Sequence, residues 1–562
     1  MSVIVSVARG HNGSTTLLVD GKVIFYLEEE RLSREKYDGS PLLGLQKVFD
    51  YVDHIDHLVV CHTHRHGSML DWTCEDTYQG WVRKLSRKKF NFQTHFIDEI
   101  HHEMHAACGY YNSGFETAAC VIADGAGSFL KVKEISDFSY EFETIFKVSK
   151  FNEFETVYKH IGTKESIGFN ELEPNVYLTE YPGLTKMYEA VTQYCGFRPI
   201  EAGKLMGLAP YGKPNDDLPN FFVDGWGNRN LIIPTYPNAA EVNIHRYEII
   251  SEDIKQHDPE NPGQYTDIQK DLAYKVQEQT SDHMVELIRK AHELTGEKNI
   301  VICGGYGLNC VANYKYAKAF PDLNIYCEPV SHDGGTSIGG AKYVYALVTG
   351  EKPEAQTTVY YGPQYDPDNY VDDLKNFDVT DTSYQEIAKL IRDGNIVTIF
   401  QGRSEGGPRA LGNRSILFDP TIKNGKDIVN EVKHREWFRP FACSILKEKV
   451  HDWFDLAGMD ESPSMMYAVE AKEGVSDIIP SVIHVDNTCR IQTVTKEQNE
   501  HYYNLIEEFE KLSEVPILFN TSFNLGGDPL VETIEDAITT LQNSDIEYLY
   551  LPEIQKLVKI LN

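Results

Sequence analysis

Two stretches of the chain share one plan, and this repetition constrains the fold more than any other feature of the sequence. Residues 3–34 read VIVSVARGHNGSTTLLVDGKVIFYLEEERLSR, and residues 116–136 read ETAACVIADGAGSFLKVKEIS. Each has a strand rich in β-branched residues, a loop of small and polar residues, and a second strand. In the first stretch, the turn Asp20-Gly21 leads into a third strand. Two unrelated hairpins with glycine turns are the alternative, because such hairpins are common.

A duplicated strand–loop–strand unit is typical of an actin-like fold, in which two ribonuclease-H-like halves place paired loops at one cleft. Farther along, residues 299–317 and 324–350 each combine a buried strand, a glycine-rich turn and a helix start. This alternation favours an α/β domain. Between the two pairs of segments, strong helical periodicity predicts a helix over residues 266–296 that ends at Gly296.

A change in composition predicts where the first domain ends. Proline, polar residues and turn formers cluster over residues 351–369, which favours a boundary near residue 355. A chain of 562 residues is too long for one ordinary core. The expected architecture is therefore an actin-like domain over residues 1–355 and a second α/β domain over residues 356–562.

The composition excludes some classes of partner. The formal net charge of −32 repels duplex DNA and anionic membranes at long range, although solubility is the usual reason for an acidic surface. No apolar run reaches the length of a membrane span, and the start MSVIVSVARGHNGS lacks the features of a signal peptide. The ten cysteines form no C-x-x-C pair. We therefore expect reduced thiols and a cytoplasmic protein with no membrane partner.

Residues 98–114, DEIHHEMHAACGYYNSG, gather three histidines among acidic residues. A helix would place His101 and His105 on one face, since residues four apart are neighbours, and two such imidazoles can share a metal ion. The zinc-protease pattern H-E-x-x-H is absent. A solvated helix start rich in histidine is the alternative. A second and weaker set of metal candidates alternates along a strand end: His62, His64 and His66.

Basic residues of this acidic chain concentrate in the second domain. They lie in QGRSEGGPRALGNRSILFDPT, NEVKHREWFRPFACSI and HVDNTCRIQTV, and the hydroxyl- and glycine-rich stretch LFNTSFNLGGDPLVE follows. Guanidinium groups bind phosphate bidentately, and glycines let backbone N–H groups approach it. Each arginine alone is more often a surface or salt-bridge residue, but the group together predicts a polyphosphate site. No Walker loop is present, which disfavours an ordinary P-loop ATPase.

The chain resembles, over nearly its full length, the O-carbamoyltransferase family that includes the tobramycin, cephalosporin and nodulation-factor carbamoyltransferases. The matching motifs occur in the order EEERLSREKYDG, HHEMHAA, GKLMGLAPYG, GGYGLNCVAN, GGPRALGNRSI, REWFRPFA, VDNTCRIQTV and NTSFNLGGDP. The resemblance implies an actin-like domain, similar to the metal-binding subunit of the tRNA threonylcarbamoyladenosine machinery, joined to a YrdC-like domain over residues 356–562.

The resemblance also implies a reaction in two steps. The YrdC-like domain would form carbamoyl adenylate from carbamoyl phosphate and ATP, with Mg²⁺ accompanying the nucleotide. The actin-like domain would pass the carbamoyl group to an acceptor hydroxyl and release AMP. Fe(II) would bind the adenylate there, although other divalent metals suit mixed imidazole and carboxylate ligands on chemical grounds. By motif match, the metal ligands would be His101, His105, Asp124 and Asp333.

Further residue roles follow from the same match. His11, on the first cleft loop, would be the base that takes the proton of the acceptor hydroxyl. His102 would be an extra histidine outside the ligand set, either next to the ligands or on the surface. Adenylate-binding candidates in the first domain are Gly125, Lys204, Gly304, Gly305 and Asn309. Candidates for binding carbamoyl phosphate and ATP in the second domain are Arg409, Arg414, Lys433, Arg439, Arg490, Ser522 and Asn524.

Two positions depart from the family pattern. Asn12 stands where the family usually has an aspartate, and Gly526 stands where it often has a basic residue. The acceptor is open: a small molecule, a sugar or antibiotic, or a hydroxymethylated pyrimidine in a nucleotide or in DNA, which would make nucleic acid a partner only as acceptor. A homodimer is also open. Competing functions are an actin-like small-molecule kinase, a hydrogenase-maturation carbamoyltransferase and a binding protein with inactive loops.

Overall fold

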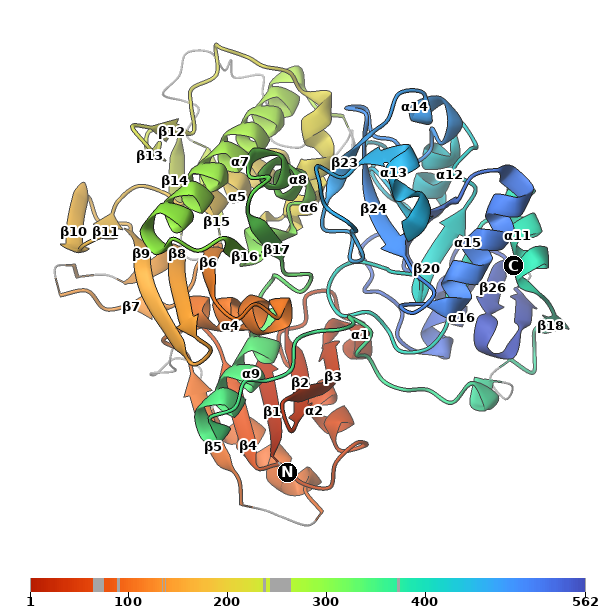
Figure 1. Ribbon diagram of the computed structural model, residues 1–562, viewed down its shortest axis with the longest axis horizontal. Coiled ribbons are helices and arrows are strands. Elements are labelled where there is room, and N and C mark those ends of the chain that lie inside the picture. The colour runs from red at the N-terminus through yellow and green to blue at the C-terminus, as the bar shows by residue number, and fades with distance from the viewer. Residues whose placement is uncertain are drawn as a thin grey trace. The chain divides into compact units, whose positions relative to one another are not determined.

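The computed structural model describes residues 2–63, 75–87, 91–133, 135–136, 138–235, 239–242, 264–370 and 374–560. The chain forms two compact units (Figure 1). Unit 1 comprises Met1–Ile24 and Gly39–Thr357, and unit 2 comprises Phe25–Asp38 and Thr358–Asn562. Of the second set of metal candidates, His64 and His66 lie outside the described residues.

Unit 1 is built on two sheets. The first has the strand order β3-β2-β1-β4-β5, with β2 antiparallel to β1 and with β1, β4 and β5 parallel. All six residues of β1 are buried, as expected for a run of β-branched residues in the centre of a sheet. The strands are β1 (Val3–Ala8), β2 (Ser14–Val19), β3 (Lys22–Glu28), β4 (His57–Cys61) and β5 (Gln93–Ile97). Of β3, only the residues up to Ile24 belong to unit 1.

The second sheet of unit 1 repeats this topology. Its central order is β9-β8-β6-β16-β17, again with two antiparallel pairs followed by two parallel pairs. The strands are β6 (Ala118–Ala123), β8 (Ser139–Lys150), β9 (Glu153–Thr163), β16 (Asn299–Cys303) and β17 (Asn324–Cys327). β10 (Phe169–Glu173) and β11 (Val176–Thr179) extend its outer edge, and β7 (Phe129–Leu130) pairs with β8. The repeated order confirms the predicted actin-like, duplicated ribonuclease-H-like fold.

Two helices lie between the sheets, as Figure 1 shows: α4 (His101–Ser113) and α9 (Gly335–Thr349). α4 packs on α9, β6 and β16, while α9 also packs on β1, β2 and β4. Other helices of unit 1 are α2 (Leu42–Val48), α3 (Glu75–Leu85), α5 (Leu184–Tyr194), α6 (Ala202–Leu208), α7 (Asp267–Thr295) and α8 (Cys310–Ala319). α7 begins at a Thr266–Gln269 capping box and ends at Gly296 in the left-handed conformation, which confirms the predicted helix.

Unit 2 is an α/β unit around one mixed sheet, in which β19 pairs with β26 and β21 with β24 in parallel. Its order is β18-β27-β26-β19-β20-β25-β21-β24-β23-β22. The strands are β18 (Asp378–Asp381), β19 (Val397–Phe400), β20 (Arg414–Phe418), β21 (Ala442–Leu446), β22 (Phe454–Asp455), β23 (Ala468–Ala471), β24 (Thr488–Val494), β25 (Ile517–Ser522), β26 (Tyr548–Leu551) and β27 (Lys556–Lys559). The helices are α11 (Tyr384–Arg392), α12 (Gly425–Val432), α13 (Val450–Trp453), α14 (Val475–Ile478), α15 (Glu500–Ser513) and α16 (Ile534–Gln542).

The segment Phe25–Asp38, which includes α1 (Glu30–Ser33), belongs to unit 2. The guanidinium of Arg31 is buried and donates to the backbone oxygens of Glu405 and Gly407, and it pairs with Glu28 at 2.8 Å. The predicted boundary near residue 355 is close to the start of Thr358–Asn562, but the prediction placed Phe25–Asp38 in the first domain. Among the described residues, no helix combines the length and the apolarity that a bilayer span requires.

Candidate active site

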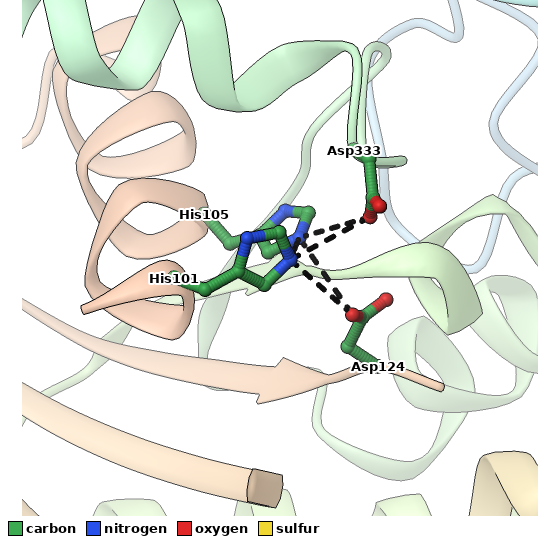
Figure 2. Close-up of side chains that lie close together, drawn as sticks. All are labelled: His101, His105, Asp124 and Asp333. Atoms are coloured by element: carbon green, nitrogen blue, oxygen red, sulfur yellow. Dashed lines mark hydrogen bonds and ion pairs between the residues drawn. The ribbon is translucent and has the colours of Figure 1, made fainter. Parts of the chain in front are cut away.

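Four side chains of unit 1 converge on one point (Figure 2). His101 and His105 lie on α4, Asp124 follows β6, and Asp333 precedes α9. His101 Nε2 is 3.1 Å from His105 Nε2, 3.5 Å from Asp124 Oδ2 and 3.6 Å from Asp333 Oδ1. His105 Nε2 is 3.6 Å from Asp333 Oδ1 and 4.0 Å from Asp124 Oδ2. One ligand atom of each residue lies within 4.8 Å of the others.

This cluster can hold a metal ion, because it offers nitrogen and oxygen donor atoms and because its two carboxylates carry negative charge. Two imidazole nitrogens and two carboxylates form a mixed donor set that suits divalent transition metals. Burial alone would lower the pKa of His101, but hydrogen bonds to Asp124 and Asp333 raise it to about 10. Buried carboxylates that hold an imidazole in its charged form are equally suited to a metal cation.

Neighbouring groups contact two of the four ligand candidates, Asp124 and His105. The Gly305 N–H donates to Asp124 Oδ1 at 3.0 Å, and His105 Nδ1 lies 3.8 Å from Cys303 Sγ. Such outer contacts orient metal ligands and set their tautomers. Gly304 has a φ of 90°, and a side chain there would collide with the backbone of Ala123. Gly304 and Gly305 therefore shape the loop that holds Asp124.

His102 lies inside unit 1 and outside the cluster. It is completely buried, and its Nδ1 is 2.8 Å from Thr144 Oγ1. Burial lowers the pKa of His102 to about 4, so this imidazole is neutral at pH 7. Of the two positions expected for His102, the one on the surface is therefore wrong, and the one outside the ligand set agrees with the structure.

His11 lies on the loop between β1 and β2, at the edge of the cluster. Its Nε2 is 3.5 Å from Asp333 Oδ2, and its Nδ1 is 3.1 Å from Asn12 Oδ1. With the Nδ1 proton donated to Asn12, Nε2 is the basic atom of the neutral ring. Asn12 therefore supplies an acceptor for His11 where the family usually has a carboxylate. Burial opposes a charged ring, but Asp333, the Asn12 hydrogen bond, Asp124 and Glu189 together raise the pKa of His11.

The other predicted adenylate residues divide into two groups. Gly125 follows Asp124 directly, next to the loop of Gly304 and Gly305. Asn309 instead caps α8 by accepting from the Ala312 N–H at 3.1 Å, and it bonds Gln277. Lys204, on α6, pairs with Glu201 at 3.1 Å and lies over the Phe197 ring. The roles predicted for Asn309 and Lys204 stay predictions.

The structure adds two residues that the sequence reading missed, Lys186 and Glu189 on α5. Lys186 is completely buried and pairs with Glu189 at 2.8 Å. The sequence could have predicted a buried Lys186 from its place on the apolar face of an amphipathic helix. A single lysine in a helical pattern is, however, usually exposed to solvent.

In unit 2, five of the seven predicted residues come together. Lys433 Nζ donates to the backbone oxygens of Ser522 and Asn524, and lies 3.1 Å from Asn524 Oδ1. Burial, together with the charges of Arg435 and Arg439, lowers the pKa of Lys433 well below its usual value. Burial and the charges of Arg439 and Arg490 do the same to Arg435. Several cations thus lie close together here, and Arg439 also pairs with Glu436 at 3.5 Å. The anion-binding role of this group stays a prediction.

Arg414 does not join that group. It is completely buried, and its guanidinium donates to the backbone oxygens of Gln401, Asn413, Gly402 and Glu532 while stacking 3.7 Å from the Phe400 ring centroid. The N–H groups of Arg414 donate to backbone oxygens inside unit 2. Arg414 is therefore a structural residue and not a substrate-binding one. Arg409 is half-buried in the loop between β19 and β20, and its role stays a prediction.

Gly526 has a packing reason. Its N–H donates to the Lys433 backbone oxygen at 2.7 Å, and a Cβ at this position would lie 2.5 Å from the His434 oxygen. A larger residue here would displace the chain that carries Lys433. Gly526 therefore allows the close backbone contact that positions Lys433, and it adds no charge to the cation group.

Sequence comparison assigns both parts of the chain to one family. Residues 68–342 match the family described as Carbamoyltransferase N-terminus, and residues 388–556 match Carbamoyltransferase C-terminus. The chain belongs to the carbamoyltransferase family. It is therefore an enzyme of the carbamoyltransferase type, as the sequence motifs predict.

Relatives of this carbamoyltransferase include nodulation proteins. It is 30% identical over 576 residues to the nodulation protein NolNO of Sinorhizobium fredii, covering 96% of this chain and 78% of that protein. It is 35% identical over 247 residues to nodulation protein U of Rhizobium tropici, covering 43% of this chain and 41% of that protein. Full-length HypF in its phosphate- and nucleotide-bound form aligns with a TM-score of 0.37 at 12% identity, over 62% of this chain and 56% of that one.

Proposed function

We propose that this carbamoyltransferase is an ATP-dependent O-carbamoyltransferase that works through carbamoyl adenylate. Unit 2 would be the YrdC-like, adenylate-forming unit, and unit 1 would transfer the carbamoyl group to an acceptor hydroxyl. The observation that carries the proposal is the pairing, in unit 1, of a His/His/Asp/Asp cluster with His11, whose Nε2 is 3.5 Å from Asp333. A metal site next to an imidazole base suits acyl transfer to a hydroxyl.

In the first step, the cations of unit 2 would bind the two anionic substrates. Lys433, Arg435, Arg439 and Arg490 lie close enough for their positive charges to repel one another, and Glu436 compensates part of that charge by pairing with Arg439. Carbamoyl phosphate and MgATP provide anions for this group, and the same cations stabilise the charge that grows on pyrophosphate as it leaves. Atom balance requires one water for the step, which also releases inorganic phosphate from carbamoyl phosphate.

In the second step, unit 1 would hold the adenylate next to His11. A divalent metal, Fe(II) by the family resemblance, would be held by His101, His105, Asp124 and Asp333 and would supply positive charge for the adenylate phosphate. His11 Nε2 takes the proton of the acceptor hydroxyl while the oxygen attacks the carbamoyl carbon, and AMP leaves. Asn12 keeps the Nδ1 proton in place during this transfer.

The compartment and the acceptor complete the proposal. The nine cysteines of the described residues are buried and form no disulfide with one another, which supports a reducing cytoplasm. The acceptor is a hydroxyl-bearing small molecule, sugar or hydroxymethylated pyrimidine. An actin-like kinase, the competing function, leaves the cation group of unit 2 without a role.

The test is a pair of assays on the full chain with iron supplied. Pyrophosphate release should require both carbamoyl phosphate and ATP, and AMP should appear when an acceptor from a panel of hydroxyl compounds gains the mass of a carbamoyl group. A kinase would instead release ADP and add the mass of a phosphoryl group. Pyrophosphate release that is indifferent to carbamoyl phosphate would reject the proposal.

A further inference from the structure

A carboxylate that the proposed mechanism does not use lies against the loop of the metal cluster. Glu189, on α5, approaches Gly125 so closely that a Cβ there would be 2.5 Å from Glu189 Oε1. On the same helix, Thr185 Oγ1 donates to the backbone oxygen of Asp124. The start of α5 is therefore tied to the loop that presents Asp124, and Glu189 Oε1 faces the residue next to it.

Glu189 is held in place by a buried ammonium group. Lys186 is 0% exposed, and its Nζ lies 2.8 Å from Glu189 Oε2. A buried ammonium is costly unless a carboxylate compensates it, so Lys186 and Glu189 fix each other. Within the described part of the chain, Glu189 Oε1 accepts no hydrogen bond, and the side chain keeps 17% of its surface exposed. One oxygen of a rigid carboxylate is thus open to a ligand.

Glu189 Oε1 lies beside the loop that carries the metal-ligand candidate Asp124, because it faces Gly125, the next residue of that loop. Asp333 and Asp124 direct oxygens to the histidines, and Asp124 Oδ1 accepts from Gly305. Within the described residues, Glu189 Oε1 is therefore a carboxylate oxygen beside the Asp124 loop that none of these groups engages.

The carbamoyl group has a feature that requires such an acceptor. It differs from an acetyl group by an NH₂ in place of a methyl group, and an apolar pocket would take both alike. A site that hydrogen-bonds the NH₂ rejects the analogue that lacks it, because a buried acceptor would be left unpaired. The nitrogen is bonded directly to the reacting carbon, so its acceptor must lie in the space shared by His11 and the cluster.

We propose that Glu189, positioned by Lys186, accepts a hydrogen bond from the NH₂ of carbamoyl adenylate and so selects carbamoyl over acetyl groups. This inference rests on the proposed function, since it takes carbamoyl adenylate as the ligand of unit 1. It makes Glu189 a substrate-binding residue and Lys186 a positioning residue that acts through it.

The test uses two stable adenylate analogues that differ in one group. 5′-O-(N-carbamoylsulfamoyl)adenosine carries the NH₂, and 5′-O-(N-acetylsulfamoyl)adenosine carries a methyl group. Calorimetric titrations are made on the full, metal-loaded chain carrying Arg439→Ala, which weakens binding in unit 2. With Glu189 present, the carbamoyl analogue should bind about ten- to a hundredfold more tightly, the scale of one hydrogen bond to a charged group.

Substitutions then separate recognition from folding. In Glu189→Ala, the preference should fall to about one through loss of affinity for the carbamoyl analogue alone, while Glu189→Gln, which keeps a carbonyl oxygen, should retain part of it. Lys186→Met should lower the preference because the carboxylate is no longer fixed. Glu286→Gln, an exposed residue of α7 that pairs with Arg289, is the matched control and should leave the preference unchanged.

The contrary results are distinct. An equal loss of both analogues in Glu189→Ala, or an unchanged preference, would overturn the role of Glu189. Equal affinities in the chain that retains Glu189 would do the same and leave the proposed function standing. Failure of that chain to bind either analogue would count against the proposed function as well. A change confined to acceptor affinity would assign Glu189 to the acceptor instead.

Discussion

The surroundings of the unit 1 cluster favour an added positive charge, whereas the surroundings of the unit 2 cluster disfavour one. In unit 1, burial is outweighed by Asp124 and Asp333, which raise the pKa of His101 to about 10. In unit 2, burial and neighbouring arginines lower the pKa of Lys433 well below its usual range. A site that stabilises an extra proton suits a cation, and a site that disfavours one suits an anion.

This difference indicates a division of labour. A metal cation belongs with the imidazoles and carboxylates, and phosphate substrates belong with the crowded cations. If so, substitutions in one cluster should leave the reaction of the other cluster intact. Each of the following predictions tests that independence.

The largest effect is expected for the double substitution His101→Ala, His105→Ala. Loss of both imidazoles should remove the metal, and carbamoyl transfer should fall to background, while pyrophosphate release continues at the wild-type rate. Metal analysis and the two half-reaction assays measure these outcomes. His292→Gln, on α7 outside the cluster, should keep its metal. Full metal content in the double variant would disprove the site.

A smaller loss is expected for His11→Ala. Removal of a general base should lower carbamoyl transfer by roughly 10²–10⁴-fold, with pyrophosphate release and metal content unchanged. The measurement is single-turnover transfer to acceptor alongside metal analysis. Parallel losses of metal, stability and transfer would mean that His11 only supports the loop. Transfer near the wild-type rate would require another base, and His332 beside Asp333 would be the next candidate.

Arg439→Ala changes the proposed anion site of unit 2 and leaves the metal ligands of unit 1 intact. Removal of one cation that stabilises the leaving pyrophosphate should lower carbamoyl phosphate-dependent pyrophosphate release by about a hundredfold. Metal content in unit 1 should not change. Lys511→Ala, an exposed residue of α15 that pairs with Glu507 and Glu508, is the control of equal charge. Normal release in Arg439→Ala would mean that the chemistry lies elsewhere.

The smallest effect is expected for Gly526→Ala. The new methyl group would meet the His434 oxygen at 2.5 Å, so the chain that carries Lys433 must shift. Overpacking of this kind costs about 1–3 kcal/mol of stability, and pyrophosphate release should fall by less than in Arg439→Ala. Denaturant melts and the release assay measure both. An unchanged rate together with unchanged stability would show that this glycine is dispensable.

The features that the sequence predicted correctly depend on local periodicity. The i, i+4 spacing of His101 and His105 requires only a helix, and the paired strand–loop–strand stretches at 3–34 and 116–136 require only alternating strands and turns. Both patterns survive in the folded chain because each is fixed by neighbours in sequence. The repeated sheet order follows from them.

The features that it missed depend on contacts distant in sequence. Arg414 looks like the other arginines of its stretch, but its place in β20 directs it into the interior, where Phe400 and backbone oxygens surround it. Lys186 is one lysine in a helical pattern, and only the packing of α5 against the Asp124 loop reveals that it is buried. Residue type does not report burial in such cases.

The segment Phe25–Asp38 also bears on how the protein is made. Glu405 and Gly407, which bind Arg31 of this segment, lie 374 and 376 residues later in the chain and are therefore synthesised long after it. Until then, the guanidinium of Arg31 lacks the backbone oxygens that it binds in the finished chain. Unit 2 therefore cannot complete its folding as a late, separate module. Its folding is complete only after Thr358–Asn562 has been synthesised and has packed with the earlier segment Phe25–Asp38.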